Sequence, residues 1–548
     1  MVFARRSTTL LAAIIASCAM VLSLTACTSD NKTVVDGQTT VTSNSAGGVA
    51  VFTPSDGITL NQQTPLNKWA KLVPDLAKAL ADAGFKKGDI DHTTSDSLAK
   101  QSRAIQDFVV DHLSNNTTDD SGIAIAPDNM TLLVAPVVEA DASTRQYGDY
   151  ISQNLSTNDA TDEGATSDGE SSEDDSSKDD SSKDDSSNTE SDSTASDEQA
   201  QAVDRLVSSL KLAKESGMHV VLLGNSIEGY KPDAFVKFSD AQTIGKLQAE
   251  KMVSKLKLDK ASKDNPKYIE VLLPYTAVDE KGNANDSTFA QEAFRGIWQV
   301  LGSYYQKGVV ESPSGTLDGK STENDWQAVA YDAAKEGSTA KVLDKRLAKT
   351  DGQSTLTRID GIITMNDYIA SEVVKELDDL GYTGSAADIN PQITISGIVG
   401  NITGKKDLSR DAVPDPIKSP ENDNANDSSS SDDDADEDTS ASDKDRDSQW
   451  PLVTGYGAYV SNIPSIVNGK QWMTGMEDRQ TIATDIAQAC AKLNKDEALN
   501  SMPSIRNSEV GGVKKIPTIS EPLLAVSASN LKSALIDPGY ISLADAGL

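Results

Sequence analysis

The chain has few cysteines and histidines for its length. Only three residues of each kind occur in 548. Cys18 and Cys27 lie near the N-terminus, so the rest of the chain holds Cys490 alone and no disulfide framework is open to it. Cys490 shares an apolar helical stripe with Ile482 and Ile486, and we predict that it is a core residue. The body must therefore be held together by hydrophobic burial.

Motifs of enzymatic chemistry are also missing. The sequence contains no His-Glu-x-x-His, no Gly-x-Ser-x-Gly and no glycine-rich phosphate loop ending in Lys-Ser or Lys-Thr. Carboxylate pairs such as Asp149 with Glu139, or Asp367 with Asp378, carry little information in so acidic a chain, and we interpret them as solvated surface charges. We expect no catalytic residue, no cofactor and no metal site.

Positive charge is scarce, with 50 Lys and Arg against 84 Asp and Glu and a net charge of −34. Two low-complexity runs carry most of the excess: 16 acidic residues against two Lys in 159–200, and 12 against one Lys and one Arg in 421–449. This balance excludes nucleic acid as a partner. The runs lack aromatic residues and the spacing of a calcium loop, so we predict disordered insertions over 156–198 and 410–449.

The N-terminus has the order of a secretory signal. Arg5 and Arg6 precede an apolar run over 10–24, too short to span a bilayer comfortably, and Leu24-Thr-Ala-Cys27 follows. This ending is similar to a bacterial lipobox, and the other interpretation is an ordinary cleaved signal with a chance cysteine. We predict a signal peptide over 1–26, lipidation of Cys27, a flexible tether over 27–48, and anchoring on the extracytoplasmic face of the cell membrane.

After the tether, short β-rich runs alternate with amphipathic helical patterns, which is typical of parallel α/β layers. We predict an α/β fold of two Rossmann-like lobes with parallel sheets joined by a hinge. The N-terminal lobe covers 49–230, the C-terminal lobe 231–477, and a returning helix and tail over 478–548 is shared by both. The predicted helices include 66–83, 98–113, 200–216, 244–256, 289–306, 326–347, 368–380 and 478–493, and the predicted strands include 48–53, 131–136, 219–224, 268–273, 359–364, 393–397, 451–455 and 523–526.

Ligands of open α/β sheets bind at the carboxyl ends of the strands, so residues just after strands are candidate contacts. Trp69 and Tyr456 are among the aromatic residues that could face the apolar surface of a sugar, although each could equally be a packing residue. The polar candidates after strands are Ser55, Asp56, Asn225, Ser226, Asn285, Asp286, Asn366 and Asp367.

The segments that follow the predicted strands resemble the type I periplasmic-binding-protein family. Within it, the chain is most similar to monosaccharide-binding proteins and lipoproteins of ABC importers for xylose, glucose and similar sugars. The resemblance implies the two-lobed fold of that family, a small-molecule ligand between the lobes and a membrane permease as partner. It covers most of the mature chain and is carried by 217–226, 238–245, 360–367, 451–457, 466–471, 523–526 and 539–540.

The chain also departs from the family pattern. Gly224 and Asn225 stand where sugar binders typically carry Asp-Arg, and Gly457 stands where they carry an Asp. The segment 395–398 competes for that strand, but it supplies no Asp either. Glu477 stands where the family often places Gln or Lys. The resemblance thus implies ligand contacts first at Asn366 and Asp367, then at Asn225 and Trp69, with Asn285, Glu477 and Tyr456 as further candidates.

Three functions are compatible with these observations. The first is a solute-binding lipoprotein that captures a small polar ligand, a sugar, and delivers it to an ABC transporter permease through closure of a hinge. The second is a sensory or scaffolding lipoprotein of the same fold that binds a non-sugar ligand or a partner protein, which the lost pocket residues favour. The third, a surface hydrolase, needs a carboxylate pair that the sequence does not single out.

Overall fold

The computed structural model describes residues 33–35, 38–40, 46–56, 65–115, 125–138, 144–156, 190–278, 285–348, 356–386 and 448–548. The chain divides into two units, Met1–Ser45 and Ala46–Leu548. In the first, the described residues form one antiparallel pair, β1 (Thr33–Val35) and β2 (Gln38–Thr40), inside the stretch for which we predicted a tether. The predicted signal peptide and Cys27 lie outside the described residues.

The first sheet of the larger unit has seven strands. They are β3 (Gly48–Pro54), β4 (Ile90–Ser95), β5 (Met130–Val134), β7 (His219–Leu223), β9 (Ala234–Val236), β17 (Ile505–Val510) and β18 (Val513–Ile519). Their order is β17-β18-β9-β7-β5-β3-β4. All neighbours pair in parallel except β17 and β18, which form an antiparallel hairpin. We call this sheet with its helices the N-terminal lobe.

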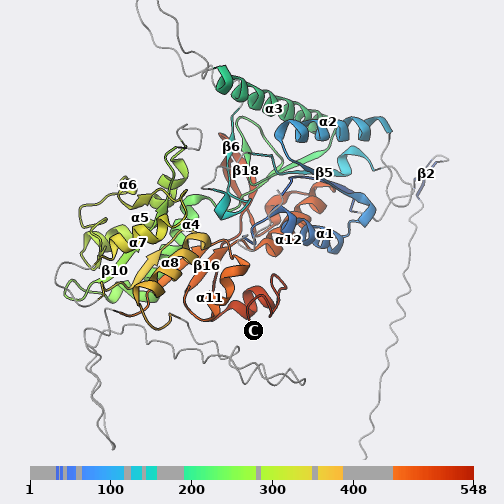
Figure 1. Ribbon diagram of the computed structural model, residues 1–548. Coiled ribbons are helices and arrows are strands. Elements are labelled where there is room, and N and C mark those ends of the chain that lie inside the picture. Colours follow the sequence, from blue (N-terminus) through green and yellow to red (C-terminus); the bar gives the residue numbers. More distant parts are fainter. Residues whose placement is uncertain are drawn as a thin grey trace, which may run out of the picture. The chain divides into compact units, whose positions relative to one another are not determined.

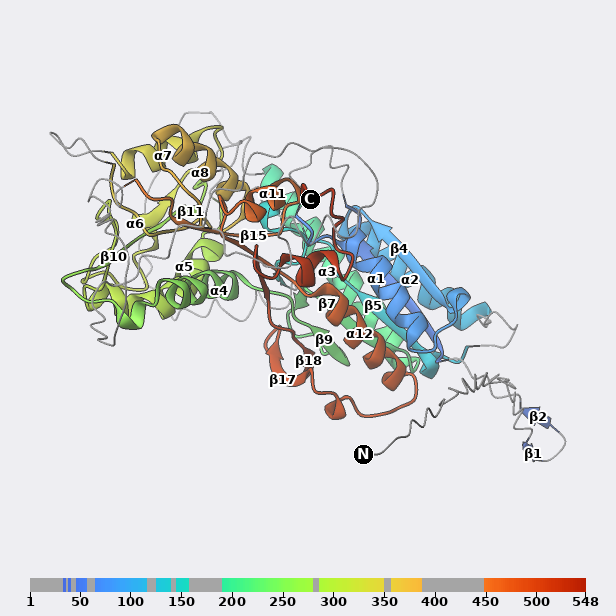
Figure 2. The same cartoon turned by 90° about the horizontal axis from the view of Figure 1, so that it is seen from below.

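Helices cover both faces of this sheet, which explains why its central strands are apolar throughout. They are α1 (Trp69–Asp82) and α12 (Arg479–Leu493) on one face, and α2 (Leu98–Asn115) and α3 (Glu190–Glu215) on the other. Val51 packs with Leu76 and Ile486 in one core, whereas Phe52, its neighbour in β3, packs with Leu206 in another. Figure 1 shows α2 beside α3, and Figure 2 shows α1 close to α12.

The second sheet has six strands, and with its helices it forms the C-terminal lobe. The strands are β10 (Lys267–Val271), β12 (Val310–Glu311), β14 (Gly361–Ile363), β15 (Leu452–Tyr456), β16 (Met473–Met476) and β19 (Leu524–Ser527). Their order is β12-β10-β14-β15-β16-β19, and only β19 is antiparallel to its neighbour.

Helices cover both faces of the second sheet as well. Ile269 and Ile363 pack in the core with α4 (Ala241–Leu256) and α5 (Thr288–Gln306). Ile362 packs on the opposite face in the core with α7 (Ser338–Arg346) and α8 (Asp367–Leu380). The remaining elements are β6 (Asn154–Leu155), β8 (Ser226–Ile227), β11 (Leu273–Pro274), α6 (Trp326–Val329), β13 (Ala330–Tyr331), α11 (Ile463–Val467), a π-helical turn over Lys532–Ile536, and the 3-10 turns Lys87–Asp89, Pro127–Asn129, Arg145–Tyr147, Leu258–Lys260, Val460–Asn462 and Leu499–Ser501.

The chain passes between the two sheets three times. It leaves the first sheet after β9, through 237–240, and returns after β16, through 477–478. It then completes the first sheet with β17 and β18 and crosses again through 520–523 to β19. The two lobes are thus linked by three short segments. The predicted fold class, two lobes with parallel-dominated sheets, is confirmed by this topology.

Some predicted elements are wrong in extent. The predicted helix 326–347 is instead α6, β13 and α7. Gly337, with a left-handed φ of 71°, precedes α7 and prevents one helix from running through this position. The helix predicted from residue 200 begins at Glu190, within the stretch assigned to the acidic insertion. The predicted strand 393–397 lies outside the described residues.

Other elements were missed by the prediction. β4 is an edge strand with mostly exposed polar residues, so it lacks the apolar signal of the central strands. The hairpin of β17 and β18 does carry a signal: Gly511 and Gly512 at its turn both have positive φ, which is typical of a tight hairpin.

Candidate ligand-binding site where the two sheets meet

The carboxyl ends of the strands of the two sheets meet in this fold. Gly457 follows β15, and its carbonyl accepts a hydrogen bond of 2.8 Å from the N–H of Leu66 in the N-terminal lobe. Glu477 follows β16, and its Oε1 accepts one of 2.7 Å from the N–H of Ser239, which follows β9. The predicted ligand-binding edge of each sheet therefore faces this junction.

Glu477 joins the first two crossing segments. Its side chain is buried, and its hydrogen-bond donors are the N–H of Ser239 and, at 3.4 Å, the hydroxyl of Tyr456. Burial raises the pKa of Glu477 to about 7, although hydrogen bonds from the side chain and main chain of Ser239 and from Tyr456 oppose the rise. Tyr456 is buried too, and burial raises its pKa far above the ordinary range. The strength of this contact therefore depends on the protonation of one carboxyl group.

Asp367 is a buried hub inside the C-terminal lobe. Its Oδ2 accepts hydrogen bonds of 2.9 Å from the N–H of Tyr459 and from Oγ1 of Thr474, and its Oδ1 accepts one of 2.7 Å from Nε2 of Gln471. Burial raises its pKa to about 6 in spite of these donors. Interpretation as a solvated surface charge is thus wrong for Asp367. Both of its carboxylate oxygens are engaged within the protein.

The close packing around Asp367 explains a glycine in β15. A Cβ atom at Gly455 would lie 2.2 Å from Oδ1 of Asp367 and 2.7 Å from Nε2 of Gln471. No side chain fits there without displacing the carboxylate. Glycine at this position is therefore required by the hub.

Asn366 connects the C-terminal lobe to the segment 144–151 of the N-terminal lobe. Its Oδ1 caps α8 by accepting a hydrogen bond of 2.9 Å from the N–H of Ile369. Its Nδ2 donates to Oε1 of Gln146 at 3.0 Å, and the hydroxyl of Tyr459 donates to the carbonyl of Gln146 at 2.6 Å. The first of the predicted ligand contacts is therefore bonded to the protein itself.

Aromatic rings gather on both sides of the junction. The ring of Tyr147 lies 4.6 Å from that of Phe289 and 6.2 Å from that of Tyr456. Trp69, the first residue of α1, makes edge contacts with Tyr150 at 5.1 Å and with Phe238 at 5.7 Å. Trp69 and Tyr456 are thus buried in aromatic clusters that flank Glu477 and Ser239.

Two carboxylates cover the N-terminus of α1, where Lys68 provides no capping side chain. Asp149 pairs with Lys68 at 2.7 Å and accepts a hydrogen bond from the N–H of Trp69 at 3.1 Å, and Asp56 accepts one from the N–H of Ala70 at 3.0 Å. Burial and the neighbouring Asp56 raise the pKa of Asp149 to about 7, against the effect of Lys68. Interpretation of Asp149 as a solvated charge is therefore wrong.

Asn225 and Asn285 are held by main-chain groups. Asn225 donates to the carbonyl of Pro136 at 2.9 Å and accepts from the N–H of Gln153 at 2.9 Å. Asn285 donates to the carbonyl of Thr276 at 2.8 Å. The contacts described above link Trp69, Asn366, Asp367, Tyr456 and Glu477 around the junction. Asn225 instead joins Pro136 and Gln153, and Asn285 ties its own loop. A ligand contact for any of the seven stays a prediction.

Backbone geometry explains why two residues typical of the family pattern are absent. Gly457 has a φ of 114°, and a Cβ atom there would lie 2.9 Å from the ring of Tyr459 and 3.2 Å from Pro65. Gly224 has a φ of 72° and faces the ring of Trp69. A side chain at either position would be strained, so this backbone does not accommodate a polar side chain at Gly224 or Gly457.

The sequence pattern did not reveal the role of segment 144–151 or of Tyr459. Gln146, Tyr147 and Gly148 follow no predicted strand, so none of them is among the predicted ligand contacts. A signal does exist: Tyr147-Gly148-Asp149-Tyr150 places two aromatic residues around a glycine, which is unusual for a solvated loop. Only long-range contacts show that Tyr147 packs in the C-terminal lobe and Tyr150 in the N-terminal lobe.

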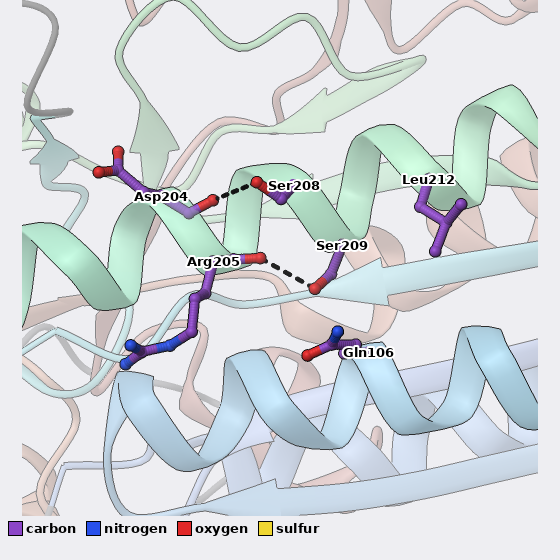
Figure 3. Close-up of a pocket in the computed structure, with 6 residues that line it drawn as sticks. All are labelled: Gln106, Asp204, Arg205, Ser208, Ser209 and Leu212. Carbon is purple, nitrogen blue, oxygen red and sulfur yellow. Dashed lines mark hydrogen bonds between the residues drawn. The ribbon is translucent and has the colours of Figure 1, made fainter.

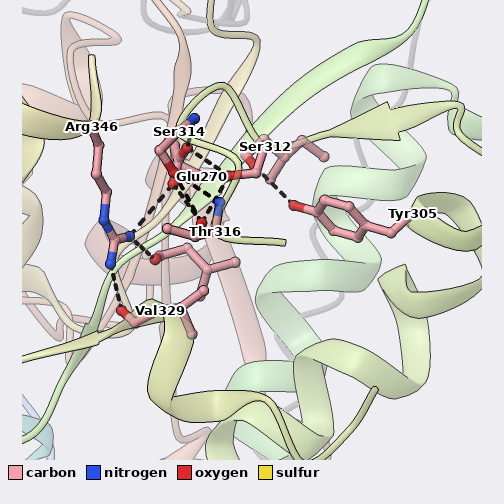
Figure 4. A network of polar contacts seen from close by, with 9 residues as sticks. Glu270, Tyr305, Ser312, Ser314, Thr316, Val329 and Arg346 are labelled. Carbon is pink, nitrogen blue, oxygen red and sulfur yellow. Dashed lines mark hydrogen bonds and ion pairs between the residues drawn. The ribbon is translucent and has the colours of Figure 1, made fainter. Parts of the chain in front are cut away.

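A second buried polar network lies inside the C-terminal lobe (Figure 4). Glu270 of β10 accepts hydrogen bonds from Oγ of Ser312 at 2.7 Å and from the N–H of Ser314 at 2.8 Å, and pairs with the guanidinium of Arg346 at 3.5 Å. Arg346 also donates to the carbonyls of Val271 and Val329. Because partners are provided on every side, this network is a structural tie between β10, the loop after β12, and α7.

The surface also has a groove of about 300 Å³ between α2 and α3 (Figure 3). Its two hydroxyls are bonded to their own helix, Ser208 to the carbonyl of Asp204 and Ser209 to that of Arg205. Its lining residues are Gln106, Asp204, Arg205, Ser208, Ser209 and Leu212, and none belongs to the junction. We interpret it as the seam of two packed helices.

The described part of the chain offers neither a metal-binding cluster nor a membrane-spanning helix. No group of three or more His, Cys, Asp or Glu residues in these ranges is arranged to hold a metal ion. Among the same residues, no helix combines the length and the apolar character needed to cross a membrane.

Neither a family model nor a curated protein matches the chain. Solved structures do. An ABC transporter solute-binding protein from Clostridium phytofermentans, with bound β-D-glucose, is 17% identical with a TM-score of 0.43, over 91% of this chain and 99% of that one. A carbohydrate transporter solute-binding protein from Chloroflexus aurantiacus, in complex with D-glucose, is also 17% identical with a TM-score of 0.43. The match covers 92% of this chain and 98% of that one.

A periplasmic ribose ABC transporter protein from Conexibacter woesei is 13% identical with a TM-score of 0.41, over 90% of this chain and 96% of that one. These three solved structures are proteins of ABC transporters. At such low identities and TM-scores the sugars named belong to those proteins. The fold of this chain rests on its own sheet topology.

Proposed function

We propose that this chain is an extracytoplasmic solute-binding lipoprotein, without enzymatic activity, that captures a small polar ligand between its lobes and delivers it to an ABC transporter permease. The single observation that supports this most is the junction: two parallel sheets whose carboxyl ends meet and whose lobes are joined by three short crossing segments. Such an arrangement allows one lobe to close on the other around a ligand.

The proposed ligand is a sugar, and Asn366, Tyr456, Glu477 and Trp69 are proposed to border it once the lobes part. Amide, carboxyl and hydroxyl groups beside aromatic rings suit a hydroxylated ring with apolar faces. Anchoring through a lipid on Cys27 belongs to the same proposal and would keep the protein near its permease.

Thermal unfolding in the presence of single sugars tests the ligand class. A sugar at a hundred times its dissociation constant should stabilise the folded protein by about 2.7 kcal/mol. D-glucose, D-xylose and a panel of oligosaccharides should include one that raises the melting temperature. If none does, while an amino acid or a nucleoside does, the carbohydrate proposal fails.

A sensory or scaffolding lipoprotein of the same fold is the second candidate. It is favoured by the fact that Asn366, Asp367 and Glu477 are already bonded within the protein, and by the loss of an arginine after β7. A permease gene beside the gene of this protein would favour transport, and a histidine kinase gene would favour sensing.

A further inference from the structure

The segment 144–151 is attached firmly to the N-terminal lobe by its second half. The N–H of Asp149 donates to the carbonyl of Asn67 at 2.8 Å, and the hydroxyl of Tyr150 donates to the carbonyl of Lys68 at 2.6 Å. Gly148 has a φ of 99°, and a Cβ atom there would lie 2.5 Å from the carbonyl oxygen of Asn67. This half of the segment therefore lies directly on the start of α1.

The first half of the segment is attached to the other lobe. Gln146 accepts hydrogen bonds from Nδ2 of Asn366 and from the hydroxyl of Tyr459. The side chains of Tyr147 and, at the end of the segment, Ile151 are buried in the core of the C-terminal lobe, whereas that of Tyr150 is buried in the core of the N-terminal lobe. Two tyrosines three residues apart thus belong to different hydrophobic cores.

The groups that hold this segment are groups that a ligand would need. Asn366 and Tyr456 are among the predicted contacts, and both are engaged here, by Gln146 and by the ring of Tyr147. An amide and a phenol ring are also reasonable substitutes for the polar and apolar faces of a small ligand.

We propose that residues 144–151 form an internal strap that holds the two lobes together without ligand and that competes with ligand for Asn366 and Tyr456. Opening then requires Gln146, Tyr147 and Ile151 to leave the C-terminal lobe, while Asp149 and Tyr150 keep the strap on α1. The competition rests on the proposed function; the holding of the lobes does not.

The double variant Gln146→Ala with Tyr459→Phe tests the strap. It removes both hydrogen bonds of Gln146 to the C-terminal lobe and leaves the ring of Tyr459, Asn366 and the packing of Tyr147 in place. Gln153→Ala, two residues beyond the segment, is the matched control, because the hydrogen bonds of Gln153 with Asn225 and Ser226 use its main chain.

The distance between the lobes is measured by energy transfer between two dyes on the full chain. Cysteines introduced at the exposed Lys100 and Lys320 carry the dyes, and Cys18 and Cys27 are changed to serine. Cys490 is fully buried and stays unlabelled. In the absence of ligand, transfer should be less efficient in the double variant than in wild type and in the control.

Binding of D-glucose and D-xylose is then titrated on the same proteins. Removing two hydrogen bonds from a two-state equilibrium should tighten the apparent dissociation constant roughly tenfold, because less of the protein is held closed. Unchanged energy transfer in the double variant and in the single Tyr459→Phe variant overturns the strap. Reduced transfer with unchanged sugar affinity overturns the competition. Reduced transfer with no sugar bound by any of the proteins supports the strap and counts against the proposed ligand class.

Discussion

Glu270 and Glu477 are both fully buried carboxylates, but their surroundings differ. Glu270 has the guanidinium of Arg346, a hydroxyl and a main-chain N–H around it, all from the C-terminal lobe. Glu477 lies between the lobes, and its hydrogen bonds come from Ser239 and from the hydroxyl of Tyr456, with no cation among them. Burial raises its pKa to about 7.

This difference separates a structural tie from a junction that responds to conditions. Removing a partner from a buried carboxylate that is paired with a cation leaves an uncompensated charge and strongly destabilises the fold. Such a pair therefore holds one arrangement. A buried carboxylate that lacks a cation changes its protonation easily and leaves the surrounding contact adjustable. Glu270 ties elements of the C-terminal lobe in the first way, and Glu477 connects the lobes in the second.

The largest expected effect is that of Arg346→Ala. It leaves Glu270 buried without its cation, and the free energy of unfolding should fall by about 3–5 kcal/mol. Urea denaturation measures the loss, and Lys100→Ala, which breaks the exposed pair with Asp96, is the control expected to change nothing measurable. If Arg346→Ala loses no more stability than the control, the pair of Glu270 and Arg346 is not a structural tie.

Asp367→Asn should be the next most damaging change. Whichever way the new amide is turned, its NH₂ group faces a donor, either Gln471 or Tyr459, and the loss should be about 2–3 kcal/mol. The same urea experiment measures it. A variant as stable as wild type would mean that Asp367 is a ligand contact only and that its internal bonds contribute little.

The junction should make stability depend on pH. The folded protein binds a proton on Glu477 more tightly than the unfolded chain, because burial raises the pKa from its ordinary 4.5 to about 7. This contribution is complete below pH 4.5 and is lost as the pH rises through 7. Glu477→Gln should remove roughly 1–3 kcal/mol of the difference in unfolding free energy between pH 5 and pH 8.

The measurement compares urea midpoints of wild type and Glu477→Gln at the two pH values. Asp149, whose pKa is also raised to about 7, acts in the same direction and should keep part of the dependence in the variant. The acidic runs affect both proteins alike, so the difference isolates Glu477. Parallel pH profiles for the two proteins would contradict the assignment.

Asn366→Ala should have the smallest effect of the four. It removes the cap of α8 and the hydrogen bond to Gln146, and the loss should be about 1 kcal/mol. Thermal unfolding measures it, and restoration by Asn366→Ser or Asn366→Asp would identify the capping part. If neither restores stability, the contact with Gln146 carries the effect.

Much of the fold could be predicted from the sequence because apolar runs and helical stripes are local. The strands around Val51, Leu133 and Val221 and the helix around Ile486 lie close to where the pattern placed them. The edge strand β4 was missed because its side chains are exposed and polar. Asn366 and Asp367 were placed correctly after a strand, but their partners were invisible to the pattern.

The sequence by itself determined the layered α/β class, the helical position of Cys490 and the paucity of catalytic motifs, since these follow from composition and periodicity. Only the tertiary structure decided that Asp367 is a hub, that Glu477 joins two crossing segments and that Tyr147 and Tyr150 belong to different cores. The physical reason is distance along the chain: Gln146 and Asn366 are 220 residues apart, and no local pattern specifies such a contact.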